Sequence, residues 1–130
     1  MDRNYRVMCE VLDKAAEAHR RRRAYDFDDF RDIQQLDKVI GELERLKRDG
    51  LLDGAAEFIN GMCLTCAVSG LTEEGEAFYR LIENDHVRAI IVGTLKEADI
   101  DVPYPLLKEV CEEIVKRYVT SFIPDIPRRQ

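Results

Sequence analysis

The hydrophobic pattern of the chain changes at one point, and this change constrains the fold more than any other feature. Before residue 50, apolar residues recur every three or four positions, whereas residues 51–71 are rich in β-type residues around Asn60–Gly61. An Asn-Gly pair favours a type I′ turn because both residues tolerate positive φ. Residues 51–71 are therefore predicted to form a β-hairpin. The predicted cross-strand pairs are Ile59 with Met62 and Glu57 with Leu64.

Three helical segments are predicted before the hairpin. The first covers residues 2–20 and carries apolar residues at helical spacing. Asp26 is a candidate N-cap for a short second segment, in which Phe27, Phe30 and Ile33 recur every third residue. The third runs from about Gln34 to Asp49 and ends at Gly50.

Three more helices are predicted after the hairpin. Thr72 should cap a helix that ends near Asn84, because acidic residues follow it in the positive first turn. The other two are expected from about Asp85 to Ala98 and from Pro103 to about Phe122, and residues 123–130 should be irregular.

The expected fold is mainly α with a small β-hairpin, an α+β class. The order helix, helix, helix, hairpin, helix is that of a winged helix-turn-helix, here residues 1–84. Residues 85–122 would then be an appended helical extension that packs on the same domain. A length of 130 residues fits one domain.

The central part of the chain resembles the small prophage-type winged-helix proteins of unknown function, including the YjcQ-like group. The resemblance rests on Met1-Asp-Arg, on the helix end Leu46-Lys-Arg-Asp-Gly-Leu-Leu-Asp-Gly54, and on Gly70-Leu-Thr-Glu-Glu-Gly-Glu-Ala-Phe78. Residues 101–110 are also similar to an appended helix in some members. The resemblance covers most of the chain, although residues 36–85 carry its specific part. It implies the fold and a mobile-element setting but no established activity.

Composition excludes several classes of protein. The longest apolar runs, such as residues 89–92, are far shorter than the roughly 20 residues that span a bilayer. The N-terminus has no apolar signal core, so we expect a cytoplasmic protein rather than a secreted disulfide scaffold. With 45% apolar residues, the chain is globular rather than disordered.

The third helix occupies the recognition position of a winged helix. Its apolar face should centre on Leu36, Val39 and Leu43. The opposite face carries Gln34, Lys38, Gly41, Arg45 and Arg48. Gln, Lys and Arg can read base edges in a major groove or hold phosphates. A solvated face that only keeps the protein soluble is the alternative.

A run of four arginines is the second candidate for contact with DNA. Arg20, Arg21, Arg22 and Arg23 form the densest positive patch of the chain and could hold phosphates. The nearby Asp26, Asp28 and Asp29 could instead neutralise them, and we favour this interpretation.

The predicted wing argues against contact with DNA. Residues 51–71 contain no Lys or Arg, whereas many DNA-binding wings place a basic side chain in the minor groove. The tip instead presents Phe58, Asn60, Gly61 and Met62, which suits a protein surface. The net charge of −6 is concentrated after residue 53, where acidic side chains exceed basic ones by five. DNA binding must therefore be local and sensitive to salt.

The last helix carries a wide apolar stripe that is either core or a dimer interface. Its principal residues are Leu107, Cys111, Ile114, Tyr118 and Phe122. Core packing is the simpler interpretation. Winged-helix regulators also dimerise through such helices, however, and palindromic sites require two-fold symmetry, so a homodimer is expected.

No pattern in the sequence indicates an enzyme, a cofactor or a metal site. The chain has no P-loop, dinucleotide fingerprint or His-Glu-x-x-His motif. Cys63-Leu-Thr-Cys66 has the spacing of half a zinc site or a redox pair, but no second ligand pair follows. We interpret these residues as ordinary half-buried cysteines.

These observations favour a winged-helix DNA-binding protein, a small transcriptional regulator of a prophage or other mobile element. In this hypothesis Gln34, Lys38, Arg45 and Arg48 face the groove and the arginine run contacts phosphates of double-stranded DNA. The alternative is a protein-binding winged helix, such as an acidic, anti-CRISPR-like inhibitor of a host defence nuclease. A purely structural dimerisation module is a third possibility.

Overall fold

The chain is mostly helical with one antiparallel hairpin, which confirms the predicted α+β class. The structure is a computed structural model that describes residues 4–98 and 101–121. Its elements are α1 (Tyr5–Arg21), the 3₁₀-helix η1 (Phe27–Phe30), α2 (Leu36–Arg48), β1 (Leu52–Ile59), β2 (Met62–Leu71), α3 (Glu73–Ile82), α4 (Asp85–Ala98) and α5 (Tyr104–Ser121). None of the helices in the described ranges combines the length and the hydrophobicity that a transmembrane segment requires.

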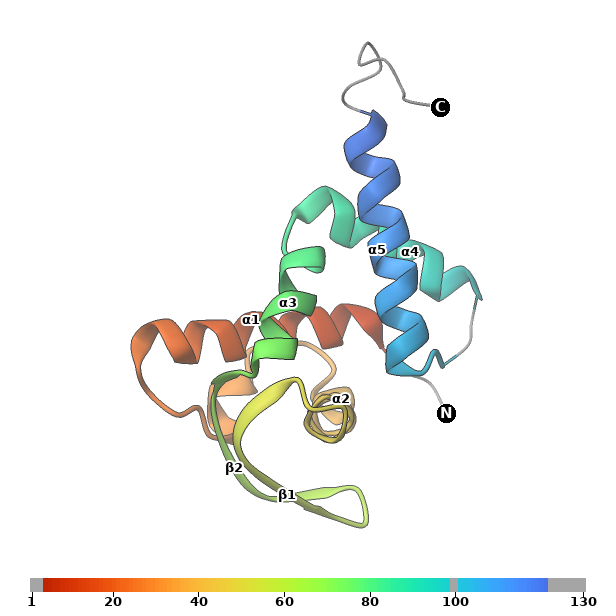
Figure 1. Ribbon diagram of the computed structural model, residues 1–130. Helices are drawn as coiled ribbons and strands as arrows, with labels where there is room; N and C mark the ends of the chain where they lie inside the picture. The colour runs from red at the N-terminus through yellow and green to blue at the C-terminus, as the bar shows by residue number, and fades with distance from the viewer. Residues whose placement is uncertain (1–3, 99–100, 122–130) are drawn as a thin grey trace.

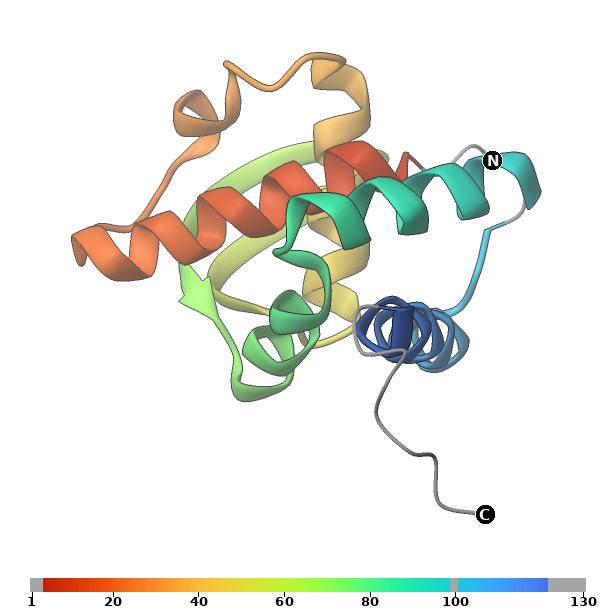
Figure 2. The ribbon, with the colours of Figure 1, turned by 90° about the horizontal axis from the view of Figure 1, so that it is seen from above.

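Helix α1 is the central element. Figures 1 and 2 show α2 and the hairpin along one part of it, and α3 and α4 along another, with α5 running crosswise. The core joins side chains from most of these helices, all fully buried: Met8, Leu12, Leu43, Leu46, Phe78, Ile82, Ile91 and Leu107. Burying each such side chain contributes about 1.5–3 kcal/mol.

Side-chain caps begin several helices where the local sequence predicts them. Asp26 and Asp29 form a capping box at η1, each side chain accepting the other's backbone N–H. The Thr72 hydroxyl accepts a 3.0 Å hydrogen bond from the Gly75 N–H at the start of α3. The predicted second helix is a single 3₁₀ turn, Phe27–Phe30, which agrees with the three-residue spacing of its apolar side chains.

The hairpin turn has the predicted backbone conformation. Asn60 and Gly61 have φ values of 50° and 76°, and Ile59 pairs with Met62 as expected. The predicted pair between Glu57 and Leu64 is wrong. Glu57 pairs with Thr65, because Leu64 is an extra residue in a β-bulge.

A second irregularity lies at the base of the hairpin, where a short third segment joins it. Asp53 pairs with Gly70, whereas Gly54 pairs with Val68. On its other edge, Val68 forms an isolated antiparallel bridge with Tyr25, with backbone hydrogen bonds of 2.7 and 2.9 Å. The segment between α1 and η1 therefore lies against the β2 edge, whereas α2 packs beside β1.

The start of α2 differs from the prediction. Gln34 lies before the helix, because Gln35 adopts the left-handed conformation (φ 65°) and the first helical residue is Leu36. Leu36, expected at the centre of the apolar face, is 37% exposed, while Val39 and Leu43 are fully buried. The predicted helix end near Phe122 and the irregular tail, residues 123–130, lie outside the described residues.

Candidate nucleic-acid interface

The outward face of α2 is open and carries charges of both signs. Asp37 and Arg48 are exposed, and Lys38 and Glu44 are half-buried. Gly41 lies at the centre of this face, and a Cβ atom added there would have no neighbour within 4 Å. Since glycine in a helix interior is about 0.5–1 kcal/mol less favourable than alanine, packing does not account for this residue.

Of the four predicted groove-facing residues, Gln34 and Arg48 are exposed and Lys38 and Arg45 are half-buried. Arg48 approaches Glu44 only at 4.0 Å and its side chain is 69% exposed. Gln34 is exposed but precedes α2, so the prediction that it lies on this helix is wrong.

Arg45 is directed toward the C-terminal extension. Its guanidinium donates a 2.9 Å hydrogen bond to Asp101, which lies just before α5. The side chain of Arg45 is 20% exposed. These two residues line an open depression of about 380 Å³ between the end of α2 and the start of α5, together with Arg48, Asp49, Val102, Pro103, Tyr104 and Pro105.

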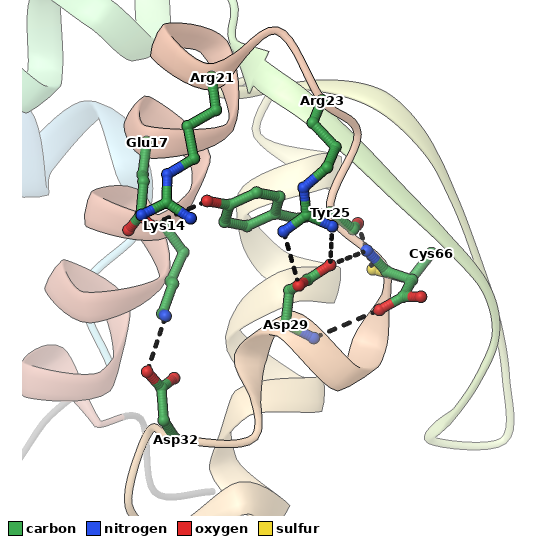
Figure 3. Close-up of polar contacts among 9 residues, drawn as sticks. Lys14, Glu17, Arg21, Arg23, Tyr25, Asp29, Asp32 and Cys66 are labelled. Atoms are coloured by element: carbon green, nitrogen blue, oxygen red, sulfur yellow. Dashed lines mark hydrogen bonds and ion pairs between the residues drawn. The ribbon is translucent and has the colours of Figure 1, made fainter.

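The four arginines at the C-terminal end of α1 are all exposed, and two of them, Arg21 and Arg23, form ion pairs (Figure 3). Arg21 forms an ion pair with Glu17 at 3.1 Å. Arg23 donates hydrogen bonds of 2.9 and 3.3 Å to Asp29, and its guanidinium lies 4.6 Å from the centre of the Tyr25 ring. The hydrogen bond from Arg23 lowers the pKa of Asp29.

Arg20 and Arg22 are exposed, and neither forms an ion pair with any residue in the described part of the chain. The arginine corner (residues 20–23) leads into Tyr25, which pairs with the free edge of β2. The ion pairs of the arginine corner are with Glu17 of α1 and Asp29 of η1, and none reaches α2 among the described residues. The two basic regions are therefore distinct.

The tip of the hairpin, which was predicted to be a wing tip, is apolar and exposed. Ile59, Met62 and Leu64 are 57%, 63% and 56% exposed. Phe58 turns the other way and is half-buried against the core. Asn60 and Gly61 at the turn are both exposed. The tip therefore presents three large apolar side chains to solvent.

The apolar stripe of α5 belongs to the core in its first half. Leu107 and Cys111 are fully buried, whereas Ile114 and Tyr118 are half-buried. Phe122 lies outside the described residues. Figure 1 shows the second half of α5 extending beyond α4, and Val119 in that half is 51% exposed.

Two polar networks that the sequence did not reveal hold the scaffold together. Arg88 of α4 donates two hydrogen bonds to Asp13 of α1, which also accepts one from the Tyr79 hydroxyl. Burial, followed by the hydrogen bond to Asp13, raises the pKa of Tyr79 to about 12. Glu42 of α2 is 2% exposed, and its carboxylate accepts a 3.2 Å hydrogen bond from the Asn4 N–H at the start of α1. The carboxylate therefore complements the positive end of α1.

Among the described residues, no group of three or more His, Cys, Asp or Glu side chains could hold a metal ion. Comparison with known proteins adds no assignment: no protein-family model, curated protein or solved structure matches the chain.

Proposed function

We propose that this protein is a winged-helix DNA-binding protein, a small transcriptional regulator of a prophage or other mobile element. The element order supports this proposal, since α1, η1, α2 and the hairpin follow one another as in a winged helix. The bridge between Tyr25 and Val68 supplies the short strand that winged helices place between their first two helices. In this arrangement α2 is the recognition helix.

The outward face of α2 is the observation that carries the proposal. Gly41 leaves the middle of this face without a side chain, so a nucleic-acid backbone or base edge can approach the helix closely. Lys38 lies one helical turn before Gly41, and Arg48 lies about two turns after it. Both side chains provide hydrogen-bond donors for bases or phosphates. The exposed Arg20 and Arg22 would add phosphate contacts from the arginine corner.

Binding to duplex DNA tests this function directly. The probe is a fluorescent duplex from the region upstream of the protein's own gene, compared with a scrambled duplex at several salt concentrations. We expect selective binding that weakens with salt. Lys38→Ala/Arg48→Ala should reduce affinity about tenfold or more and lower the log–log salt slope by roughly 2.

A matched control removes the same charge elsewhere. Arg80→Ala/Lys96→Ala changes two exposed cations on α3 and α4 and should alter affinity much less. Equal losses of DNA affinity in the two double variants would reject α2 as the recognition helix. No binding of wild type at low salt would reject the DNA-binding function.

The wing tip favours a second candidate function, a protein-binding winged helix such as an acidic inhibitor of a defence nuclease. Ile59, Met62 and Leu64 form an exposed apolar tip, and residues 51–71 contain no basic side chain. Ile59→Ser/Met62→Ser should abolish capture of a defence nuclease if this function holds. The same variant should leave DNA affinity unchanged if α2 alone contacts the ligand.

We also propose a homodimer formed through the second half of α5. Val119 in this half is exposed, whereas the nearby Val115 is half-buried against the core. A two-fold pair of recognition helices would match a palindromic operator.

A further inference from the structure

The bulge at Leu64 changes the relationship between Cys63 and Cys66. In a regular strand, residues three positions apart point to opposite faces. Here Cys63 pairs with Phe58 and Cys66 pairs with Ala56, with Leu64 inserted between them. Phe58 and Ala56 are two positions apart on β1 and share a face, so the two cysteines share a face as well.

The burial pattern supports the same conclusion. Phe58, Ala56 and both cysteines are half-buried on the face directed at the body of the domain, whereas Glu57, Leu64 and Thr65 are exposed. The Cys66 thiol approaches the Tyr25 carbonyl oxygen at 3.7 Å, and the Cys63 thiol approaches the Thr65 carbonyl oxygen at 3.4 Å. Figure 3 shows the side chain of Cys66 beside Tyr25.

The spacing suits a covalent bond between the two sulfur atoms. The two thiols interact directly, since a hydrogen bond between them opposes the rise in the pKa of Cys63 and adds to that of Cys66. The two sulfur atoms are therefore already near each other, as closure of a disulfide requires. The other cysteines, Cys9 and Cys111, are fully buried and are shielded from reagents in solution.

We propose that Cys63 and Cys66 form a vicinal dithiol on the inner face of the wing that is oxidised reversibly to an intramolecular disulfide by a small-molecule disulfide. This site is independent of the proposed function, because it requires only the hairpin register. The oxidant belongs to the class of glutathione disulfide.

The oxidation proceeds in two thiol–disulfide exchange steps. The thiolate of Cys63 attacks one sulfur of the external disulfide, whose S–S bond breaks and releases one thiolate that takes a proton from water. The thiolate of Cys66 then attacks the Cys63 sulfur of the mixed disulfide and releases the second thiolate, which is protonated likewise. Two protein thiols are oxidised, and one external disulfide is reduced to two thiols.

The surroundings assign the attacking role to Cys63. Burial raises the pKa of both thiols, that of Cys66 to about 12. A hydrogen bond from Cys66 opposes this increase in the pKa of Cys63. Cys63 is also nearer the exposed tip, where a reagent has better access.

Peptide mapping after oxidation of the native protein tests the proposal. Trypsin releases residues 49–80 as one peptide that contains Cys63 and Cys66 and neither other cysteine. After incubation with excess glutathione disulfide, we expect this peptide to lose the mass of two hydrogens and to regain it with a dithiol reductant. Cys66→Ser should instead give a glutathione adduct on Cys63.

A variant with the same number of thiols tests whether the disulfide requires both cysteines on one face of the strand, or only a short separation in the sequence. Met62→Cys/Cys63→Ser moves one thiol by a single residue to the outer face, because residue 62 pairs with Ile59. We expect glutathione adducts rather than a disulfide in this variant. The proposal is overturned if the wild-type peptide stays reduced or carries only adducts, or if the shifted variant forms its disulfide equally well.

Discussion

The guanidinium of Arg88 in α4 donates two hydrogen bonds of 2.7 Å to the carboxylate of Asp13 in α1, across 75 positions of the chain. The same guanidinium also donates to the Ile82 carbonyl oxygen at the end of α3. This bidentate pair joins the C-terminal helices to the central helix α1. It therefore helps to hold α5 in the position where its start lies near the end of α2.

Arg88→Ala should destabilise the protein by about 1–3 kcal/mol, because it leaves the half-buried carboxylate of Asp13 with fewer partners. Urea unfolding measures this change. Arg117→Ala breaks a pair with Glu113 whose side chains are 80% and 55% exposed, and should cost less than about 1 kcal/mol. Similar losses in both variants would show that Arg88 does not fasten α4 to α1.

Stability should depend on pH through Glu74 of α3, whose carboxylate accepts hydrogen bonds from Tyr104 and Lys108 of α5. The hydrogen bond from Tyr104, followed by that from Lys108, lowers the pKa of Glu74 below its ordinary value of 4.5. The unfolded chain therefore binds a proton more readily than the folded one. This contribution to stability is present above pH 4.5 and is lost as the pH falls through the lower folded-state pKa.

Melting curves between neutral and acidic pH test this effect. The stability difference between wild type and Glu74→Gln should be largest above pH 4.5 and should shrink as the pH falls. A constant difference across the range would show that ionised Glu74 does not link α3 to α5.

Gly41→Ala should have opposite effects on stability and on DNA binding. The added methyl group has open space and should stabilise α2 by about 0.5–1 kcal/mol. If a nucleic acid approaches this face closely, affinity should fall about fivefold, which corresponds to about 1 kcal/mol. Thermal unfolding and fluorescence anisotropy measure the two effects.

Gly93 in α4 provides the control, because it also lies in a helix with no neighbour within 4 Å of an added Cβ. Gly93→Ala should stabilise the protein similarly and leave DNA affinity unchanged. Unchanged affinity in Gly41→Ala would argue against close approach at α2.

Asp101→Asn should increase affinity for DNA about two- to fivefold, because it releases Arg45 beside the outward face of α2 and removes one negative charge. Glu112→Gln removes the same charge from an exposed position on α5. An increase no larger than that of Glu112→Gln would show that Arg45 does not reach the DNA once it is released.

Val119→Asp should convert the proposed dimer to a monomer, because it places a charge on the exposed apolar part of α5. Sedimentation equilibrium of both proteins measures the association. Ser121→Asp adds the same charge on another side of the helix and should leave the dimer intact. A wild-type protein that is monomeric at all concentrations would reject the dimer.

Structural features that depend on only a few neighbouring residues were predicted well. The caps at Asp26 and Thr72 and the turn at Asn60–Gly61 depend on hydrogen bonds and φ values inside a single turn of chain. The burial of Val39 and Leu43 follows from helical periodicity in the same way. These features require no knowledge of distant segments.

The errors arose where one more residue or one more contact altered the geometry. The bulge at Leu64 shifted the pairing of Glu57, and the left-handed Gln35 excluded Gln34 from α2. A wheel projection places Arg45 toward a groove, but it contains no information on Asp101, 56 positions later. A helix face is therefore an incomplete guide to which charges remain available to a ligand.

The sequence by itself determined the helices, the hairpin turn and the class of fold, because each follows from backbone hydrogen bonding and from the spacing of apolar residues along a short segment. Only the tertiary structure decided which charges are available and which residues meet. It joined Arg88 to Asp13, took Arg45 toward Asp101, paired Arg23 with Asp29, and brought Cys63 and Cys66 to one face. Each of these relationships depends on how distant segments pack or on the register of two strands, and local sequence preferences do not encode that geometry.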